Sequence, residues 1–300
     1  MKPLHLFLLI LMNGFWAASY SVFKMLSPVL NAADIATLRY GIAAASLLLF
    51  WHWLPGRTPQ GRDLARAIVM GIIAFGFSPR LQVAGVQMGR AGDASVLIAL
   101  DPLIVSISAG VFLREHIGPR RWAGFIAGLA GAMMVAEVWR PGFRLPVLTA
   151  DALIVLSLFC DATSSIMGKG IVQRNGLLKV LAVAVAAGAF TNLLLGGASS
   201  LRTATLLSLW DWSLVAYLAI VCTLVGYLLW FVVIRETPVN TAALTIFIQP
   251  VVGTAIAAVL LGESLHWGQI IGGLVIGAAL TMELLSPNQT AAPPGTVTSP

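Results

Sequence analysis

Ten apolar runs of about membrane-spanning length follow one another along this chain of 300 residues. A helix needs about 20 predominantly apolar residues to cross the hydrocarbon core of a bilayer, and each run approaches that length. Because the links between runs are short, we predict one all-α helical bundle without a soluble domain. The runs cover residues 5–26, 34–54, 66–88, 93–113, 117–138, 149–170, 176–197, 210–234, 239–261 and 267–285.

Composition agrees with a membrane protein. Hydrophobic residues make up 58% of the chain and charged residues 10%, against roughly 25% charged residues in soluble domains. The net charge of +6 comes from basic residues scattered through short loops, which argues against a nucleic-acid surface. Cys160 and Cys222 both lie inside apolar runs, so we expect them to be free, with no disulfide framework and no metal site.

The chain also repeats itself. Pairs of similar residues recur at an offset of 148 without a gap, and an earlier pair recurs at an offset of 145. We therefore predict two homologous five-helix halves, residues 1–140 and 141–285, followed by a disordered cytoplasmic tail over residues 286–300. The paired positions include Asp101-Pro102 with Gln249-Pro250, Glu115 with Glu263, and Lys24 with Lys169.

The repeat and the charges together predict the topology. Placing both termini in the cytoplasm puts eleven basic residues on the cytoplasmic side and four outside, as the positive-inside rule requires. Five spans per half is an odd number, so the second half enters the membrane inverted. Inverted repeats are typical of carriers, which bind substrate between the two halves. A channel could share this symmetry and stays open as an alternative.

Three stretches carry a family resemblance. Asn13-Gly14-Phe15-Trp16, Leu38-Arg39-Tyr40 and Leu261-Gly262-Glu263-Ser264, the last followed by Gly268-Gln269 and Gly272, resemble the paired repeats of the drug/metabolite transporter superfamily, EamA type. The resemblance implies ten helices in two inverted halves. It also implies export of amino acids or similar small metabolites across the bacterial inner membrane, with aromatic and neutral amino-acid exporters as the nearest group.

Ionisable side chains at membrane depth are the first candidates for a substrate pathway. Such groups cost about 2.5–3.5 kcal/mol on insertion scales, so they should face the bundle interior or water. Arg80 follows Pro79, which removes a backbone donor and should kink the helix. Arg80 is either a seat for a substrate carboxylate or a clamp to Asp101 or Asp161.

Asp101 and Gln249 each precede a proline, Pro102 and Pro250, where we expect both helices to bend and to expose carbonyl groups toward an inner cavity. With Pro79, these prolines are the predicted hinges. Because Gln249 replaces the acid in the second half, Asp101 is a candidate for proton coupling or for contact with a substrate amino group. The alternative is a buried hydrogen bond that locks the bend.

Aromatic side chains supply the rest of the predicted substrate pathway. Trp16, Tyr20, Tyr227 and Trp230 could line a cavity for an amphipathic zwitterion, or could simply pack or sit at the membrane interface. Asp161 and Ser164, in the sixth run, are the polar residues that we place beside them.

Five charged residues are predicted to be structural. Glu115 and Glu263 each precede a span, where a carboxylate can accept from the free N–H groups of the following helix. Lys24 and Lys169 end spans and should extend to the interface. We interpret Arg39 as a clamp near the outer helix ends.

Small residues one helical turn apart allow close helix approach. Such pairs occur in the fifth span at Gly124/Gly128 and in the tenth at Gly268/Gly272 and Gly273/Gly277. The two spans therefore either seal matching places in the scaffold or join two subunits in a homodimer.

Signals for an enzyme are missing from the sequence. The four histidines lie far apart without ligand spacing, and Gly89-Arg90-Ala91-Gly92 follows no strand, so it predicts no phosphate loop. We expect no cofactor and no metal. The predicted function is export of a small amino acid or related metabolite by alternating access. Alternatives are export of drugs, polyamines or other metabolites, a channel-like facilitator, and conversion of a lipid.

Overall fold

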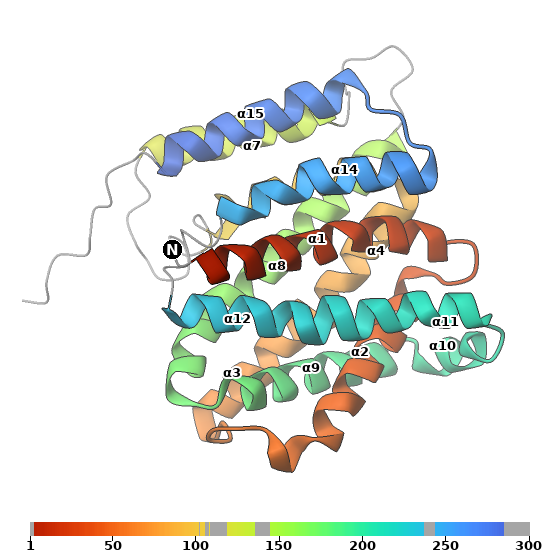
Figure 1. The fold of residues 1–300 in the computed structure, drawn as a ribbon, viewed down its shortest axis with the longest axis vertical. Coiled ribbons are helices and arrows are strands. Elements are labelled where there is room, and N and C mark those ends of the chain that lie inside the picture. Colours follow the sequence, from red (N-terminus) through yellow and green to blue (C-terminus); the bar gives the residue numbers. More distant parts are fainter. Residues whose placement is uncertain are drawn as a thin grey trace, which may run out of the picture.

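The computed structural model describes residues 3–101, 103–105, 108, 119–135, 145–236 and 244–284, and within these ranges it contains helices and no strand. Most helices run side by side (Figure 1). The α-helices are α1 (Pro3–Leu26), α2 (Ala32–Leu49), α3 (Gly61–Gly71), α4 (Ser78–Met88), α5 (Ala91–Leu97), α7 (Pro119–Val135), α8 (Leu145–Arg174), α9 (Leu177–Leu194), α10 (Gly197–Ala204), α11 (Leu209–Ala216), α12 (Gly226–Glu236), α14 (Ile248–Leu261) and α15 (Trp267–Leu284).

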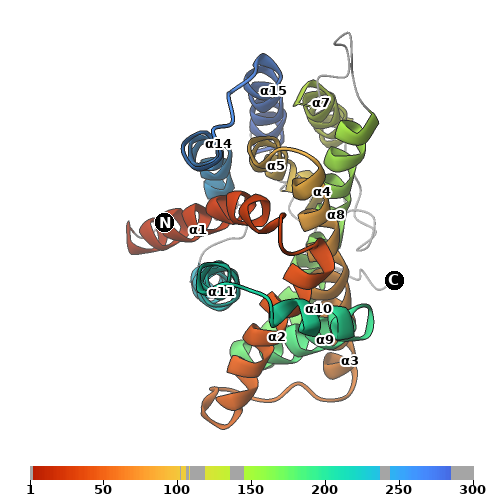
Figure 2. The same ribbon diagram turned by 90° about the vertical axis from the view of Figure 1, so that its right-hand side faces the viewer.

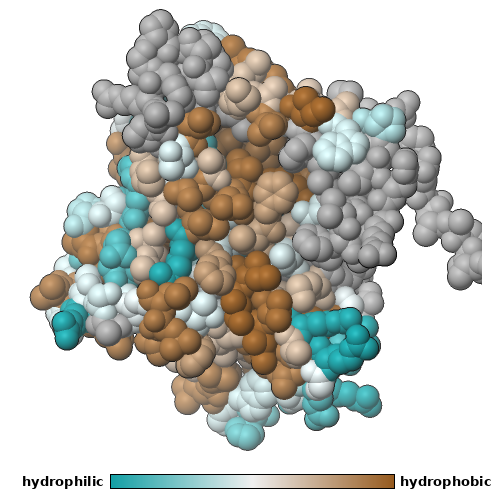
Figure 3. All heavy atoms as spheres, turned by 180° about the vertical axis from the view of Figure 1, so that it is seen from behind, coloured by the Kyte–Doolittle hydropathy of each residue, from teal (hydrophilic) through white to brown (hydrophobic). Residues whose placement is uncertain are grey.

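Five stretches are long and apolar enough to cross a membrane: Pro3–Leu26, Ala32–Leu49, Gly61–Met88, Leu177–Leu194 and Leu209–Val233. Shorter apolar helical stretches among the described residues are Ala91–Leu100, Trp122–Val135, Ile248–Leu261 and Trp267–Ala279. Large apolar side chains lie on the outside, among them Leu209, Val259 and Leu274, and much of the face in Figure 3 is apolar. Such a surface requires lipid, so the protein is a multi-pass membrane protein. The number of ten spans stays a prediction, and α10 was not foreseen.

Repeat mates pack directly on one another. Helix α2 contacts α9, α5 contacts α14, and α7 contacts α15. Figures 1 and 2 show α7 and α15 together at one end of the bundle, with α2 and α9 toward the other end. Two halves related by a two-fold axis in the membrane plane would bring their equivalent helices together in this way.

Helices α7 and α15 approach closely at Gly131 and Gly272, where an added Cβ on either glycine would lie 2.9 or 2.6 Å from the other glycine's carbonyl oxygen. Only small residues permit such an approach. The structure thus uses the small-residue faces of both helices within one chain. A homodimer through these helices stays a prediction.

Two helices contain π-helical segments at equivalent places. Segment η2 (Ile72–Phe77) joins α3 to α4, and segment η4 (Tyr217–Val225) joins α11 to α12. Their first residues are separated by 145 positions, the same offset as Lys24 and Lys169. A π-helical turn holds an extra residue and is frequent at functional sites. Both halves therefore carry the same irregularity in their third helix.

The fourth helices of the two halves are irregular as well. A 3₁₀ segment, η3 (Ile98–Leu100), follows α5 and leads into Asp101, while η5 (Leu244–Phe247) leads into α14. Gln249 and Pro250 lie in the first turn of α14. Changes of helix type therefore lie beside Asp101 and Gln249, where bends were expected. Pro102 lies outside the described residues.

Candidate functional site

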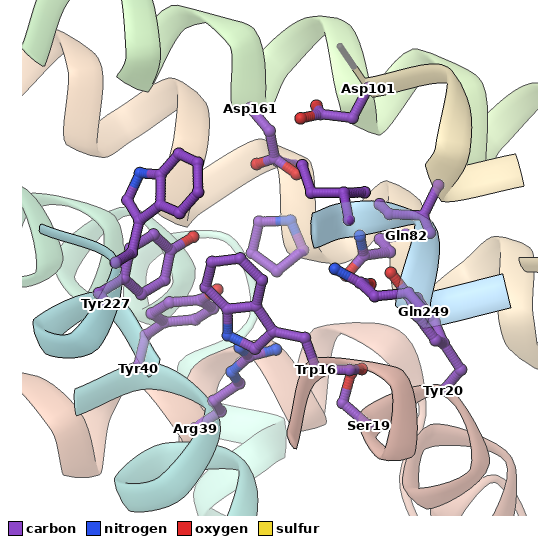
Figure 4. Close-up of a pocket in the computed structure, with 15 residues that line it drawn as sticks. Trp16, Ser19, Tyr20, Arg39, Tyr40, Gln82, Asp101, Asp161, Tyr227 and Gln249 are labelled. Carbon is purple, nitrogen blue, oxygen red and sulfur yellow. The ribbon is translucent and has the colours of Figure 1, made fainter. Parts of the chain in front are cut away.

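A cavity of about 120 Å³ lies between the two halves. Its wall combines aromatic rings, two carboxyl groups, one guanidinium group and two side-chain amides (Figure 4). The lining residues are Trp16, Ser19, Tyr20, Arg39, Tyr40, Ser78, Pro79, Gln82, Ile98, Asp101, Asp161, Tyr227, Trp230, Ile246 and Gln249.

Most of the predicted pathway residues meet on this wall. The structure brings together the four aromatic residues Trp16, Tyr20, Tyr227 and Trp230, both aspartates and Gln249, with Pro79 beside them. Pro250 lies one residue beyond Gln249. The side chains of Ser164 and Lys169, and the whole of Glu115, lie outside what the structure describes.

Indole contacts fix one side of the cavity. The Trp16 ring lies 5.5 Å from the Tyr227 ring and 6.4 Å from the Trp230 ring, centroid to centroid. Its Nε1 donates to the backbone carbonyl of Cys222, 2.8 Å away, inside η4. Tilted aromatic pairs at these distances attract one another. The π-helical segment therefore orients Trp16 in the wall.

Arg39 was predicted as a clamp near the outer helix ends, and the structure also places it on the cavity wall. Its Nε donates to Thr223 Oγ1 at 2.8 Å, and its guanidinium carbon lies 5.0 Å from the Tyr40 ring centroid and 5.8 Å from that of Phe23. Only 6% of Arg39 is exposed. Thr223 in turn donates to the carbonyl of Leu218, five residues earlier in η4. The π-helical segment η4 thus helps, through Thr223, to hold the buried Arg39 side chain.

Arg80 does not line the cavity. Its Nε donates to Asn192 Oδ1 at 2.7 Å, and its Nη2 donates to the Asn192 carbonyl at 3.0 Å. Neither the predicted carboxylate seat nor the predicted clamp to Asp101 or Asp161 anticipates this partner. Asn192 lies 112 residues from Arg80, on α9, and nothing in the spacing points to it.

A chain of buried amides connects α1 to the second half. Gln249 Nε2 donates to Asn13 Oδ1 at 2.7 Å, and Asn13 Nδ2 donates to Thr245 Oγ1 at 2.9 Å. The other Gln249 atom, Oε1, is buried and has no hydrogen-bond partner within the described structure. A buried acceptor without a partner is costly.

A second polar cluster joins the halves at the end of the bundle where α1 finishes. Glu263 Oε1 and Oε2 accept from the backbone N–H groups of Ala91 and Gly92, at 3.1 and 3.0 Å. His266 Nε2 lies 2.8 Å from Asp93 Oδ1. Glu263 therefore caps α5 of the other half, whereas we expected it to cap the helix that follows it. Asp93 and His266 were not among the predicted site residues.

Lys24 differs from its prediction too. Its Nζ donates to the carbonyl oxygens of Gln87 and Gly89 at 2.9 and 2.7 Å, at the end of α4. These carbonyls have no partner within their own helix, and a cation there is stabilised by the helix dipole. Lys24 therefore caps α4 and does not simply extend to the interface.

Metal ligands do not gather in this structure: among the described residues no group of three or more His, Cys, Asp or Glu side chains could hold an ion. The cavity itself offers carboxylates, amides and aromatic faces, which suit reversible binding of a small polar molecule.

Known proteins resemble this chain along most of its length. An uncharacterized transporter of Bacillus subtilis, YdfC, is 21% identical over 93% of this chain and 90% of its own. A probable amino-acid metabolite efflux pump of Salmonella typhimurium is 24% identical over 91% and 92%. A probable terminal-alkyne amino-acid exporter of Streptantibioticus cattleyicolor is 24% identical over 86% of both chains.

The fold and the family agree with these relatives. A solved structure at 18% identity matches 94% of this chain and 96% of its own with a TM-score of 0.55, which shows a shared fold. The model of the EamA-like transporter family matches residues 4–136 and again residues 148–284. This protein is therefore a transporter of the EamA-like family.

Proposed function

We propose that this protein exports a small amino acid, or a metabolite of similar size and charge, from the bacterial cytoplasm across the inner membrane by alternating access. The observation that carries the proposal is the polarity of the cavity. Figure 4 shows Asp101 and Asp161 at one end and Arg39 at the other, with aromatic rings between them. A zwitterion fits this arrangement, with its amino group toward the acids and its carboxylate toward Arg39.

The size of the cavity favours a small metabolite over a drug. Pockets for drug-sized ligands have volumes of about 300–1,000 Å³, whereas this cavity holds about 120 Å³. Two relatives are named for amino acids, one as a metabolite efflux pump and one as an exporter. Their names support the same substrate class.

Alternating access is supported by the placement of the cavity between repeats. Wall residues come from α1, α2, α4 and η3 in the first half and from α8, α12, η5 and α14 in the second. A rocking motion of one half against the other would open the same cavity to either side.

Flux into proteoliposomes tests the proposal. Vesicles carrying purified protein are loaded with unlabelled amino acid, and uptake of the same labelled amino acid is followed with and without a pH gradient. We expect saturable uptake that is accelerated by the internal load, because a carrier exchanges substrate. Linear, unsaturated flux would indicate a channel-like facilitator. No flux of any amino acid, from protein shown to be folded, would contradict the proposal.

Asp101→Asn and Asp161→Asn should each lower the flux at least tenfold with little change in thermal stability. The matched control is Asp211→Asn, because Asp211 is a partly exposed capping acid at the start of α11 and does not line the cavity. Normal flux in both cavity variants would contradict the assignment of the site.

A further inference from the structure

We infer that the amino group of the substrate is its obligatory feature: the cavity is a site for a primary ammonium ion on a small apolar body, and the substrate carboxylate contributes little to affinity. This inference rests on the proposed function and narrows its substrate class. It depends on which hydrogen-bonding atoms the cavity presents.

Three residues with side-chain acceptors line the cavity from three different parts of the chain. Asp101 lies at the end of η3, Asp161 lies in α8, and Gln249 lies in α14. Gln249 is 2% exposed, and its Oε1 has no hydrogen-bond partner within the described structure. Figure 4 shows the two carboxylates close together, with the Gln249 side chain lower in the view.

An ammonium group complements such a set. It carries three N–H donors and no acceptor. It can therefore donate to both carboxylates, and charge-assisted bonds to carboxylates are roughly twice as strong as neutral ones. The Gln249 side chain is held in place by the bond from its Nε2 to Asn13 Oδ1, and it adds a neutral amide to the same cavity.

Among the lining residues that the structure describes, Arg39 is the one cation, and part of its hydrogen-bonding capacity is already used. Arg39 donates its Nε to Thr223 and lies over the rings of Tyr40 and Phe23. The lining residues include two side chains with a carboxyl group and one with a guanidinium group, so acidic groups are in excess. A substrate without positive charge would bring no counter-charge to the two carboxylates, and burying charge without compensation is unfavourable.

The aromatic side favours the same ligand. Trp16, Tyr227 and Trp230 form one continuous set of rings beside the acids. Faces of indole and phenol rings attract cations, and they also cover an apolar side chain. The remainder of the substrate should therefore be uncharged and apolar.

Three matched probes test the inference: leucine, its decarboxylated amine (isopentylamine) and its deaminated acid (4-methylpentanoate). Binding to purified protein in detergent is followed by quenching of tryptophan fluorescence, since Trp16 and Trp230 line the cavity. The same series is repeated for alanine and phenylalanine. Binding avoids the leak of neutral amines through lipid that would obscure a flux assay.

We expect each amine to bind within about tenfold of its amino acid, and each acid to bind at least tenfold more weakly. Gln249→Glu should tighten amine binding, and Gln249→Leu should weaken it at least fivefold. Asp101→Asn should abolish binding of the amine and of the amino acid alike. Asp211→Asn is the control for surface charge and should leave every probe unchanged.

Two results would overturn the inference. If the acids bind as tightly as the amines while amino-acid flux stays saturable, recognition of the amino group is contradicted. The proposed function is then unaffected. If none of the nine probes binds and no flux is found in folded protein, the inference and the proposed function fail together. Should Asp101→Asn not fold, the two Gln249 variants decide.

Discussion

The Asn192 side chain donates from Nδ2 to the carbonyl oxygen of Phe75, 2.9 Å away. Phe75 lies four residues before Pro79, which has no N–H group to offer that carbonyl in a helix. Asn192 thus satisfies the acceptor that the proline leaves free. The same side chain accepts from Arg80 Nε, so a single amide supports both the bend and the adjacent cation.

Replacing Asn192 by Leu should lower the free energy of unfolding by about 2–5 kcal/mol, because the Phe75 carbonyl and the Arg80 guanidinium both lose a buried partner. Thermal denaturation of the purified protein in detergent measures the effect. The neighbouring Thr191→Val is the matched control, since Thr191 Oγ1 bonds only the Ala187 carbonyl of its own helix. A Leu variant as stable as this control would contradict the role of Asn192.

Arg39 and Arg80 should respond differently to one and the same change. Lys lacks the planar fork of Arg and cannot reproduce paired bonds such as those from Arg80 to Asn192. Arg39→Lys should raise the KM for transport several-fold, because Arg39 lines the cavity. Arg80→Lys should lower thermal stability and leave the KM within twofold. Flux measured over a range of substrate concentrations separates the two, and equal effects on KM would show that the cavity extends to Arg80.

Glu263→Gln should loosen the contact between the halves at the α5 end. An amide offers one acceptor where the carboxylate offers two, and a hydrogen bond to a charged group is worth about 1.5–3 kcal/mol. Hydrogen exchange of the Ala91 and Gly92 amides should therefore accelerate at least tenfold, as read by mass spectrometry of peptides that include them.

Asp211→Asn provides the comparison for this exchange experiment, because Asp211 also accepts a backbone N–H at a helix start, from Ser208 in its own half. Its effect should stay local to α11. Unchanged exchange at Ala91 and Gly92 in the Glu263 variant would show that the carboxylate does not hold the halves together.

Gly188→Ala should destabilise the protein by about 1–3 kcal/mol, the usual cost of overpacking. An added Cβ would collide with Phe75 Cβ and with the Gly71 carbonyl oxygen, both of which belong to the helix packed against α9. Gly14→Ala in α1 is the control, since a Cβ there meets nothing within 4 Å. The control should be neutral or slightly stabilising, as Ala favours helix over Gly. Comparing the two melting temperatures decides the matter.

Much of the cavity could be predicted because polar groups at membrane depth are rare. Asp101, Asp161 and Gln249 interrupt apolar runs, and the repeat drew attention to two of them. Tyr40 and Gln82 were missed, since an apolar run all around a helix does not say which face points inward. The cavity role of Arg39 was missed for the same reason.

Partners of the charged residues could be predicted far less well. Glu263 binds backbone N–H groups and Lys24 binds backbone carbonyl groups, and the backbone carries no sequence signal. Arg80 binds an amide on a distant helix. The π-helical segments have no sequence signature that we could use, and their equivalence became visible only through the offset of 145.

That equivalence has a consequence for the history of the chain. A π-helical turn arises when one residue is added to an α-helix, which turns everything beyond it by about 100°. A single residue insertion before the duplication, inherited by both copies, explains both η2 and η4. Two separate insertions would have to occur independently at equivalent positions. The bend that carries Ser78 and Gln82 to the cavity is then older than the gene duplication. The ancestor was then a single copy of the repeat, and it carried this bend before a second copy existed to pack against it.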